Sequence, residues 1–202
     1  MPISPDDFYA HAMQTADAQR RLPLSRMTGW EIFPFEPADL RVVPLSPPVF
    51  PEPVRAGENG FNCAACDTER PSIWSDPYWR LWTVKPSGAP LVLMLEPREH
   101  YDLPDLPDDI ACQLGVIQVH IARAIESLPH IGRVHISRWG DGSAHLHFFF
   151  FARPAGFHQL RGTCLAIWND LLPPVSAGAR DSDARAIAAA ITASYGGVSP
   201  PG

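Results

Sequence analysis

Cysteine, positive charge and long hydrophobic runs are all scarce in this sequence of 202 residues. Four cysteines are too few for the disulfide scaffold of a small secreted domain. The 16 Lys and Arg are outnumbered by 22 Asp and Glu, and the net charge of −6 argues against general binding to DNA, RNA or an anionic membrane surface. The longest apolar segments, 89–95 and 186–193, are much shorter than the roughly 18 to 20 residues of a membrane helix. We therefore expect no nucleic-acid partner and no membrane span.

The N-terminal segment also lacks the features of a secretory signal. Its first ten residues include two acids and no apolar run. We expect a cytoplasmic protein, in which a Cys-x-x-Cys pair indicates a metal site or redox chemistry rather than a structural disulfide. With 46% hydrophobic residues the chain can bury one sizeable core. We predict a Pro-rich N-terminal arm over 1–60, a core over 61–154 and a helical C-terminal extension over 155–202 that packs on the core.

Proline is abundant, and its distribution defines the arm. Seven of the 23 prolines lie between Pro34 and Pro53, where they remove backbone donors and prevent a regular helix. A short helix is expected before them, over about 5–20. Beyond the arm, the patterns predict strands over 80–84, 91–96, 133–138 and 145–151 and helices over 108–128, 160–171 and 183–194. Helices beside a small, mostly antiparallel sheet make the fold class α+β.

Two histidines share one face of the last predicted strand. Because side chains alternate along a strand, His145 and His147 point to the same side of a segment that is otherwise apolar. Buried ring nitrogens need polar partners or a metal. The alternative for either histidine alone is a core residue with one satisfied hydrogen bond.

Cys63 and Cys66 supply two thiolate ligands on a tight turn. Zinc usually completes such a pair with two further Cys or His ligands that are distant in the sequence, and the candidates are His100 and His145. A redox pair, or two unrelated small core residues, are the alternatives.

Three segments in order form a familiar pattern. They are LVLMLEPREH at 91–100, LPDL at 103–106 before the long helix, and HLHFF at 145–149 after a glycine-containing loop. Over about residues 61–154 this pattern resembles the histidine triad (HIT) superfamily. The upstream Cys-x-x-Cys makes the resemblance closer to the galactose-1-phosphate uridylyltransferase branch and to zinc-containing HIT hydrolases.

The resemblance implies roles for five residues. Cys63, Cys66, His100 and His145 would bind a structural zinc ion, and His147 would attack the α-phosphorus of a nucleotide to form a nucleotidyl-histidine intermediate. An imidazole is a competent nucleophile near neutral pH when its other nitrogen donates to a fixed acceptor. The resemblance also implies a homodimer, with the helix after His100 as a candidate contact.

The chain departs from the family pattern at the third motif position. Phe149 stands where HIT hydrolases have His and the uridylyltransferase branch has Gln, and a phenyl ring donates no hydrogen bond to phosphate. The loop before the motif is also short. Candidate substrate-binding residues are Ser137, Ser143, Arg153 and Arg161, with Arg138 and Gln159 as further donors; each arginine has a solvated surface residue as its alternative role.

Three functions follow from these residues. The first is a zinc-containing HIT-like nucleotidyl hydrolase or transferase that acts on a nucleotide or another phosphorylated small molecule through His147. The second is a binding or interaction module whose catalysis lapsed with Phe149. The third is thiol redox chemistry at Cys63 and Cys66.

Overall fold

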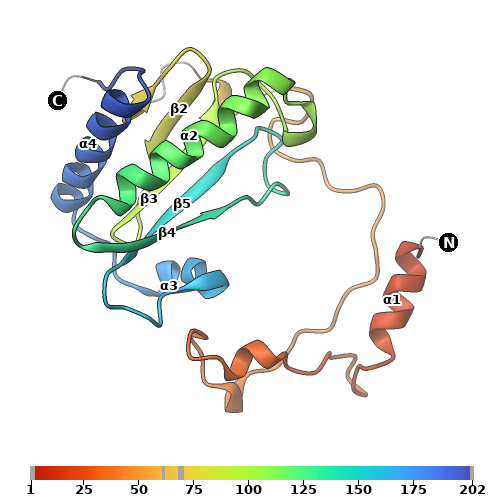
Figure 1. The fold of residues 1–202 in the computed structure, drawn as a ribbon. Helices are drawn as coiled ribbons and strands as arrows, with labels where there is room; N and C mark the ends of the chain where they lie inside the picture. The colour runs from red at the N-terminus through yellow and green to blue at the C-terminus, as the bar shows by residue number, and fades with distance from the viewer. Residues whose placement is uncertain (1–2, 61, 68–70, 201–202) are drawn as a thin grey trace. The chain divides into compact units, whose positions relative to one another are not determined.

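The computed structural model describes residues 3–60, 62–67 and 71–200 (Figure 1). The chain divides into two compact units, Met1–Val54 and Arg55–Gly202. Residues 55–60, assigned to the arm from the sequence, thus belong to the second unit. Within the described ranges, no helix has the length and apolar character needed to cross a membrane.

The N-terminal unit contains one α-helix, α1 (Pro5–Met13), and two short 3-10 turns. The side chain of Ser4 caps α1 by accepting a hydrogen bond from the backbone N–H of Asp7. The helix is shorter than the predicted 5–20 because the carboxylate of Asp17 accepts the N–H groups of Gln19 and Arg21, a local arrangement that competes with helix. The Pro-rich segment that follows contains no strand among its described residues.

The second unit is built on a five-stranded antiparallel sheet with the order β1-β2-β3-β5-β4. The predicted α+β class is confirmed. The strands are β1 (Trp74–Ser75), β2 (Trp79–Thr83), β3 (Leu91–Pro97), β4 (Ile131–Ser137) and β5 (Phe148–Pro154).

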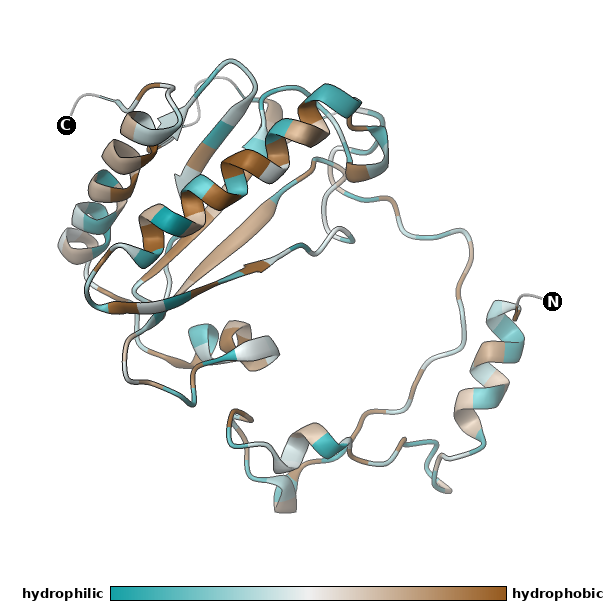
Figure 2. Ribbon diagram, in the orientation of Figure 1, coloured by the Kyte–Doolittle hydropathy of each residue, from teal (hydrophilic) through white to brown (hydrophobic). Residues whose placement is uncertain are grey.

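Two long helices cover one face of this sheet. They are α2 (Asp108–Glu126) and α4 (Ala177–Ser194), which lie beside each other in Figure 1. Helix α2 is striped with apolar and polar residues (Figure 2), and its apolar residues join the main core. Helix α4 begins six residues before the predicted 183 because Ser176 caps it. The fully buried members of the core are Trp74, Trp79, Leu81, Leu91, Leu93, Leu95, Ile117, Ile121, Ile125, Leu146, Phe150, Ala152, Ile187 and Ile191.

The other face of the sheet is covered only in part. A 3-10 turn, η6 (Gly162–Cys164), leads into the short helix α3 (Leu165–Leu171), in place of the single helix predicted over 160–171. Here Leu165 packs with Val92 and Phe151 in a second, smaller core. The next row of this face, set by the strand register, contains Trp82, Met94, Phe149 and Ser137.

Strand β5 begins at Phe148 and not at His145 as predicted. The backbone N–H of Leu146 donates to the carbonyl of Tyr101 at 2.7 Å, outside the ladder of the sheet. The N–H of His145 donates to the hydroxyl of Ser143. The backbone N–H groups of His145 and Leu146 are thus bonded to loop residues and not to neighbouring strands.

The core makes a quantitative prediction for two adjacent residues of α2. Ile117 is fully buried, whereas Val116 is 51% exposed. Ile117→Ala should lower the free energy of unfolding by about 2–5 kcal/mol, because it removes buried methyl groups and leaves a cavity. Val116→Ala, the control, should change it by less than about 0.5 kcal/mol. Urea unfolding measures both values, and equal losses would contradict this packing of α2.

Candidate metal centre and active site

Cys63, Cys66, His100 and His145 come together in the second unit, although the sequence separates the first from the last by 82 residues. One ligand atom from each lies within 4.8 Å of all the others. The Sγ of Cys63 is 3.5 Å from the Nδ1 of His145, and the Sγ of Cys66 is 3.4 Å from the Nδ1 of His100 and 3.6 Å from that of His145. Two sulfur and two nitrogen donors in this arrangement can hold a metal ion.

The cysteine pair is held in place by the segments on both sides of it. Gly57, with φ of 76°, lies so close to Cys63 that a Cβ on it would approach the cysteine side chain to 3.1 Å. After the pair, the guanidinium of Arg80 donates to the carbonyl of Asp67 at 2.6 Å. Arg80 is itself buried and forms an ion pair with Glu96 at 2.7 Å. A buried ion pair in β2 and β3 thus anchors the turn that carries both thiols.

His145 is almost completely buried, with 1% of its surface exposed. Its Nε2 lies 2.9 Å from the carbonyl oxygen of Pro97. Because a carbonyl only accepts, Nε2 carries the proton, and the lone pair of Nδ1 points to the two sulfurs in the neutral ring. Burial, only partly opposed by this hydrogen bond, lowers the pKa of His145 to about 4, so the ring is neutral at pH 7.

The thiol of Cys66 is also shifted. Burial first, and then the neighbouring Cys63 thiol, raise its pKa to about 11. Both effects disfavour a second negative charge on the pair. A bound cation would supply the compensating charge that the surrounding residues do not.

His147 lies beside the cluster and is half-buried. Its Nδ1 is 2.8 Å from the carbonyl oxygen of His145, so Nδ1 is the donor and Nε2 carries the lone pair in the neutral ring. With Cys63, Ser143, Trp82 and other residues it lines a pocket of about 310 Å³. We call this the histidine pocket.

Phe149 occupies the third motif position and fills it with an aromatic contact. Its ring centroid lies 5.4 Å from that of His147, in an edge-to-face arrangement, and 5.4 Å from that of Trp139. The ring of Phe151 follows at 6.0 Å. These separations are typical of favourable aromatic pairs.

The four predicted substrate-binding residues lie in different places. Ser143 lines the histidine pocket, and Ser137 lines a second pocket on the same face of the sheet. Arg153 donates to the backbone carbonyls of Pro154 and Phe157 and so stabilises the turn after β5. Arg161 is exposed and precedes η6. Ser143 is therefore the one that the structure brings into the same pocket as His147.

Asp102, which the sequence did not single out, is the centre of an ion-pair cluster. Its two carboxylate oxygens each lie 2.5 Å from a guanidinium, one of Arg55 and the other of Arg138. Arg55 also donates to the carbonyl of Gly140 at 3.1 Å and pairs with Glu58. Asp102 thereby joins the segment before the cysteines, the segment after His100 and the loop before His145.

The electrostatics of Asp102 follow from this position. Its burial raises the pKa, but hydrogen bonds from Arg55, the backbone N–H of Leu103 and Arg138 outweigh burial and hold the pKa below its usual range. The hydrogen bond to Leu103 is a turn cap that the sequence can indicate. The two ion pairs span 47 and 36 residues, and no local pattern reveals them.

Replacing Asp102 by Asn should loosen these three segments. The amide keeps the size of the side chain but leaves the partly buried guanidinium of Arg138 without its counter-ion and that of Arg55 with Glu58 alone, so we expect a loss of about 1–3 kcal/mol in the free energy of unfolding. Glu58→Gln is the control, because Glu58 pairs with the same Arg55 at the surface and should change the free energy of unfolding much less. Urea unfolding of both variants tests the difference, and similar small effects would contradict a central role for Asp102.

Comparisons with known proteins support the fold. No family model and no curated protein sequence matches the chain. Among solved structures, a hypothetical histidine triad nucleotide-binding protein from Sulfolobus tokodaii strain 7 matches with a TM-score of 0.50 at 12% identity, over 66% of this chain and 97% of that one.

Two further matches are of the same kind. A zinc-bound histidine triad family protein from Mycobacterium smegmatis has a TM-score of 0.48 at 19% identity, over 65% of this chain and 91% of that one. A histidine triad protein from Bradyrhizobium japonicum has a TM-score of 0.48 at 21% identity, over 60% and 90% of the two chains. The match at a TM-score of 0.50 shows the fold of the histidine triad proteins over 66% of this chain.

Proposed function

We propose that this chain is a zinc-containing HIT protein that cleaves or transfers at the phosphorus of a nucleotide or a related phosphorylated small molecule, with His147 as nucleophile. The observation that carries the proposal is the hydrogen bond from Nδ1 of His147 to the carbonyl of His145. It fixes the ring and leaves the nucleophilic nitrogen, Nε2, without the proton. The ring lines a pocket next to the four metal-binding candidates.

Zinc fits the cluster better than a redox role does. With bonds of about 2.3 Å to sulfur and 2.1 Å to nitrogen, a tetrahedral zinc ion separates these donors by about 3.6 Å. Three of the four sulfur–nitrogen distances here are 3.4, 3.5 and 3.6 Å, and all four ligand atoms lie within 4.8 Å of one another. The bond from His145 to Pro97 is the outer contact that orients a ligating histidine. When bound, zinc supplies a rigid cross-link, and four protein ligands leave it no open position for substrate.

The chemistry itself is assigned to His147. Its Nε2 attacks phosphorus, and a nitrogen–phosphorus bond forms as the bond from phosphorus to the leaving group breaks. The leaving group departs with that electron pair and takes a proton from water. Water, or an acceptor hydroxyl, then attacks the phosphorus, releases its proton to solvent and returns the electron pair to Nε2. Throughout, the carbonyl of His145 stabilises the positive ring through Nδ1–H.

The Cys-x-x-Cys before β1 further favours a relationship to the uridylyltransferase branch. All four cysteines are free, which fits the reducing cytoplasm. A homodimer remains part of the proposal, and binding of DNA or RNA does not, because the net charge is −6.

A binding module without turnover is the second candidate, and Phe149 favours it. The loss of one donor to the transition state typically costs about 2.7–4 kcal/mol, and the ring is packed between His147 and Trp139. This candidate predicts zinc and ligand binding without chemistry at His147.

Metal analysis tests the cluster directly. The purified protein should contain about one zinc ion per chain, and Cys63→Ser or His145→Ala should lose most of it, because each removes one of four ligands. Cys112→Ser is the matched control, since Cys112 is exposed on α2 and should leave the zinc content unchanged. A protein free of zinc, whose two thiols cycle to a disulfide, would instead establish the redox function.

Turnover tests the nucleophile. Nucleoside phosphoramidates, dinucleoside polyphosphates and nucleotide sugars are incubated with the protein, and products are followed by chromatography and mass spectrometry. His147→Ala should lower turnover by at least about a thousandfold, because the attacking group is gone. His158→Ala, which changes an exposed histidine after β5, should have no effect. Folded, zinc-loaded proteins that are inert across the panel would favour the binding module.

A further inference from the structure

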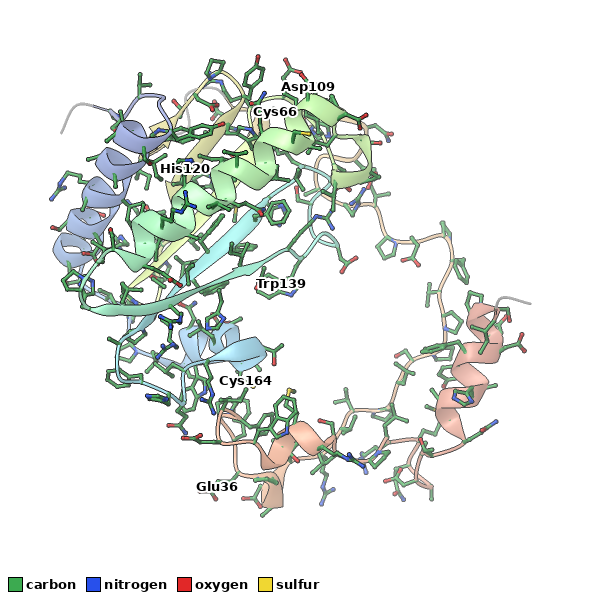
Figure 3. All side chains as sticks on the ribbon, in the orientation of Figure 1. Glu36, Cys66, Asp109, His120, Trp139 and Cys164 are labelled. Atoms are coloured by element: carbon green, nitrogen blue, oxygen red, sulfur yellow. The ribbon has the colours of Figure 1, made fainter. Side chains whose placement is uncertain are left out.

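A second pocket lies on the same face of the sheet as the histidine pocket. Its volume is about 350 Å³, within the range of small-molecule sites. It lies where β4 and the loop after it meet η6 and α3, and Figure 3 shows the side chain of Trp139 on this side of β4. We call it the β4 pocket. Its lining residues are His135, Ser137, Arg138, Trp139, Phe151, Gly162, Thr163, Leu165 and Ala166.

One aromatic ring separates the two pockets. Phe149 contacts His147 of the histidine pocket and Trp139 of the β4 pocket, with both pairs of ring centroids 5.4 Å apart. Ser137, which lines the β4 pocket, lies directly opposite Phe149 in the sheet register. A ligand whose phosphorus lies over His147 can therefore extend past Phe149 into the β4 pocket.

The walls of the β4 pocket suit a flat apolar surface. The indole of Trp139 contacts the rings of Phe149 and Phe151. Trp139 is nevertheless 50% exposed. Leu165 and Ala166 of α3 also line the pocket. A half-exposed tryptophan beside a pocket offers a planar ligand a large, rigid contact at low entropic cost.

The pocket also offers polar groups. The Nε2 of His135 is buried and has no hydrogen-bond partner in the described part of the chain. Such an atom destabilises the folded protein unless a ligand or a water molecule bonds to it. Burial, and then the positive charge of Arg153, lower the pKa of His135, so its ring is neutral at pH 7 and offers one donor and one acceptor. The hydroxyl of Ser137 can donate or accept a hydrogen bond.

The pocket does not suit an anion. Arg138 is the only arginine or lysine among its lining residues, and its guanidinium is already paired with Asp102 at 2.5 Å. An anionic ligand would lose its hydration without gaining a counter-ion. The net charge of −6 adds a further unfavourable contribution.

We propose that the β4 pocket binds an uncharged planar ring with hydrogen-bonding edges, carried by one of the groups attached to the phosphorus. This inference rests on the proposed function for its connection to His147. Trp139 stacks on the ring, and His135 and Ser137 bind its edge. Such a substrate has a phosphorus centre between two groups, one of which ends in the ring.

The test is binding of small probes, followed in the full-length protein by the indole N–H signals of its six tryptophans in a ¹H–¹⁵N NMR spectrum. Trp139→Phe and Trp82→Phe assign the signals of the β4 pocket and the histidine pocket, and Trp74, whose N–H is bonded inside the core, is the reference. The neutral probes are nicotinamide, uridine and adenosine. Nicotinate is the charged counterpart of nicotinamide with nearly the same shape.

At least one neutral probe should shift the Trp139 signal at millimolar concentration and leave that of Trp74 in place. Nicotinate should bind at least about tenfold more weakly than nicotinamide. His135→Leu and Ser137→Ala should each weaken neutral-probe binding about tenfold, whereas His130→Leu, which changes an exposed histidine paired with Asp183, should not. His147→Ala should leave probe binding unchanged, because the probes carry no phosphorus.

Three results would overturn the inference. They are a shift of the Trp82 signal without a shift of the Trp139 signal, tighter binding of nicotinate than of nicotinamide, or no shift of the Trp139 signal with any neutral probe. Each leaves the proposed function intact, since that depends on turnover by His147. Conversely, probe binding at Trp139 in a protein that is inert in the turnover panel would establish the ring site and remove its link to phosphorus chemistry.

Discussion

The buried ring of His145 is the constraint on which the site depends. Its Nε2 is bound to the carbonyl of Pro97 at the end of β3, and its Nδ1 faces the sulfurs of Cys63 and Cys66. The single imidazole of His145 thus links a central strand to the turn that carries Cys63, which lies 82 residues before His145 in the sequence. Its own carbonyl holds Nδ1 of His147. The nucleophile candidate is therefore positioned by the backbone of a metal-ligand candidate, so the integrity of the cluster and the orientation of His147 are linked.

The two faces of the sheet have different roles. One forms the core, and the other is lined with pockets. One face is buried under α2 and α4, and its strand residues are almost entirely apolar. The other is covered by α3 at Phe151 and, at the opposite end, is buried at Arg80 and Glu96, where Arg80 bonds to the carbonyl of Asp67. On the part that α3 does not cover, Phe149 stands where the resembling families have a hydrogen-bond donor, and its ring contacts those of His147 and Trp139. For the proposed function, a phenyl ring at this position would bind phosphate oxygens more weakly than a hydrogen-bond donor and would favour apolar contact with the groups that flank the phosphorus.

The sequence predicted local features well and long-range contacts poorly. Helix α2 begins at Asp108 as expected, because its apolar spacing and acidic first turn are properties of the segment itself. The start of β5 was wrong by three residues, because the bond from Leu146 to Tyr101 depends on the folded chain. The approach of the four metal-binding candidates was expected from the family resemblance and not from spacing alone. The cluster around Asp102 gave no signal, since ion pairs across 36 and 47 residues leave no periodic trace.

The charges around the site limit which leaving groups the proposed reaction at His147 could expel. Arg80 is paired with Glu96, and Arg55 and Arg138 are both paired with Asp102. These three guanidinium groups are used to hold segments together, so they do not meet the negative charge that grows on phosphate oxygens and on the leaving atom. The hydroxyl of Ser143 is a weaker donor for that charge. A reaction at His147 therefore favours a leaving group that is stable once it departs, as the anion of a weakly basic oxygen or as a protonated amine. The affinity of the site for such a substrate would then come mainly from ring contacts with Trp139, which need no charge.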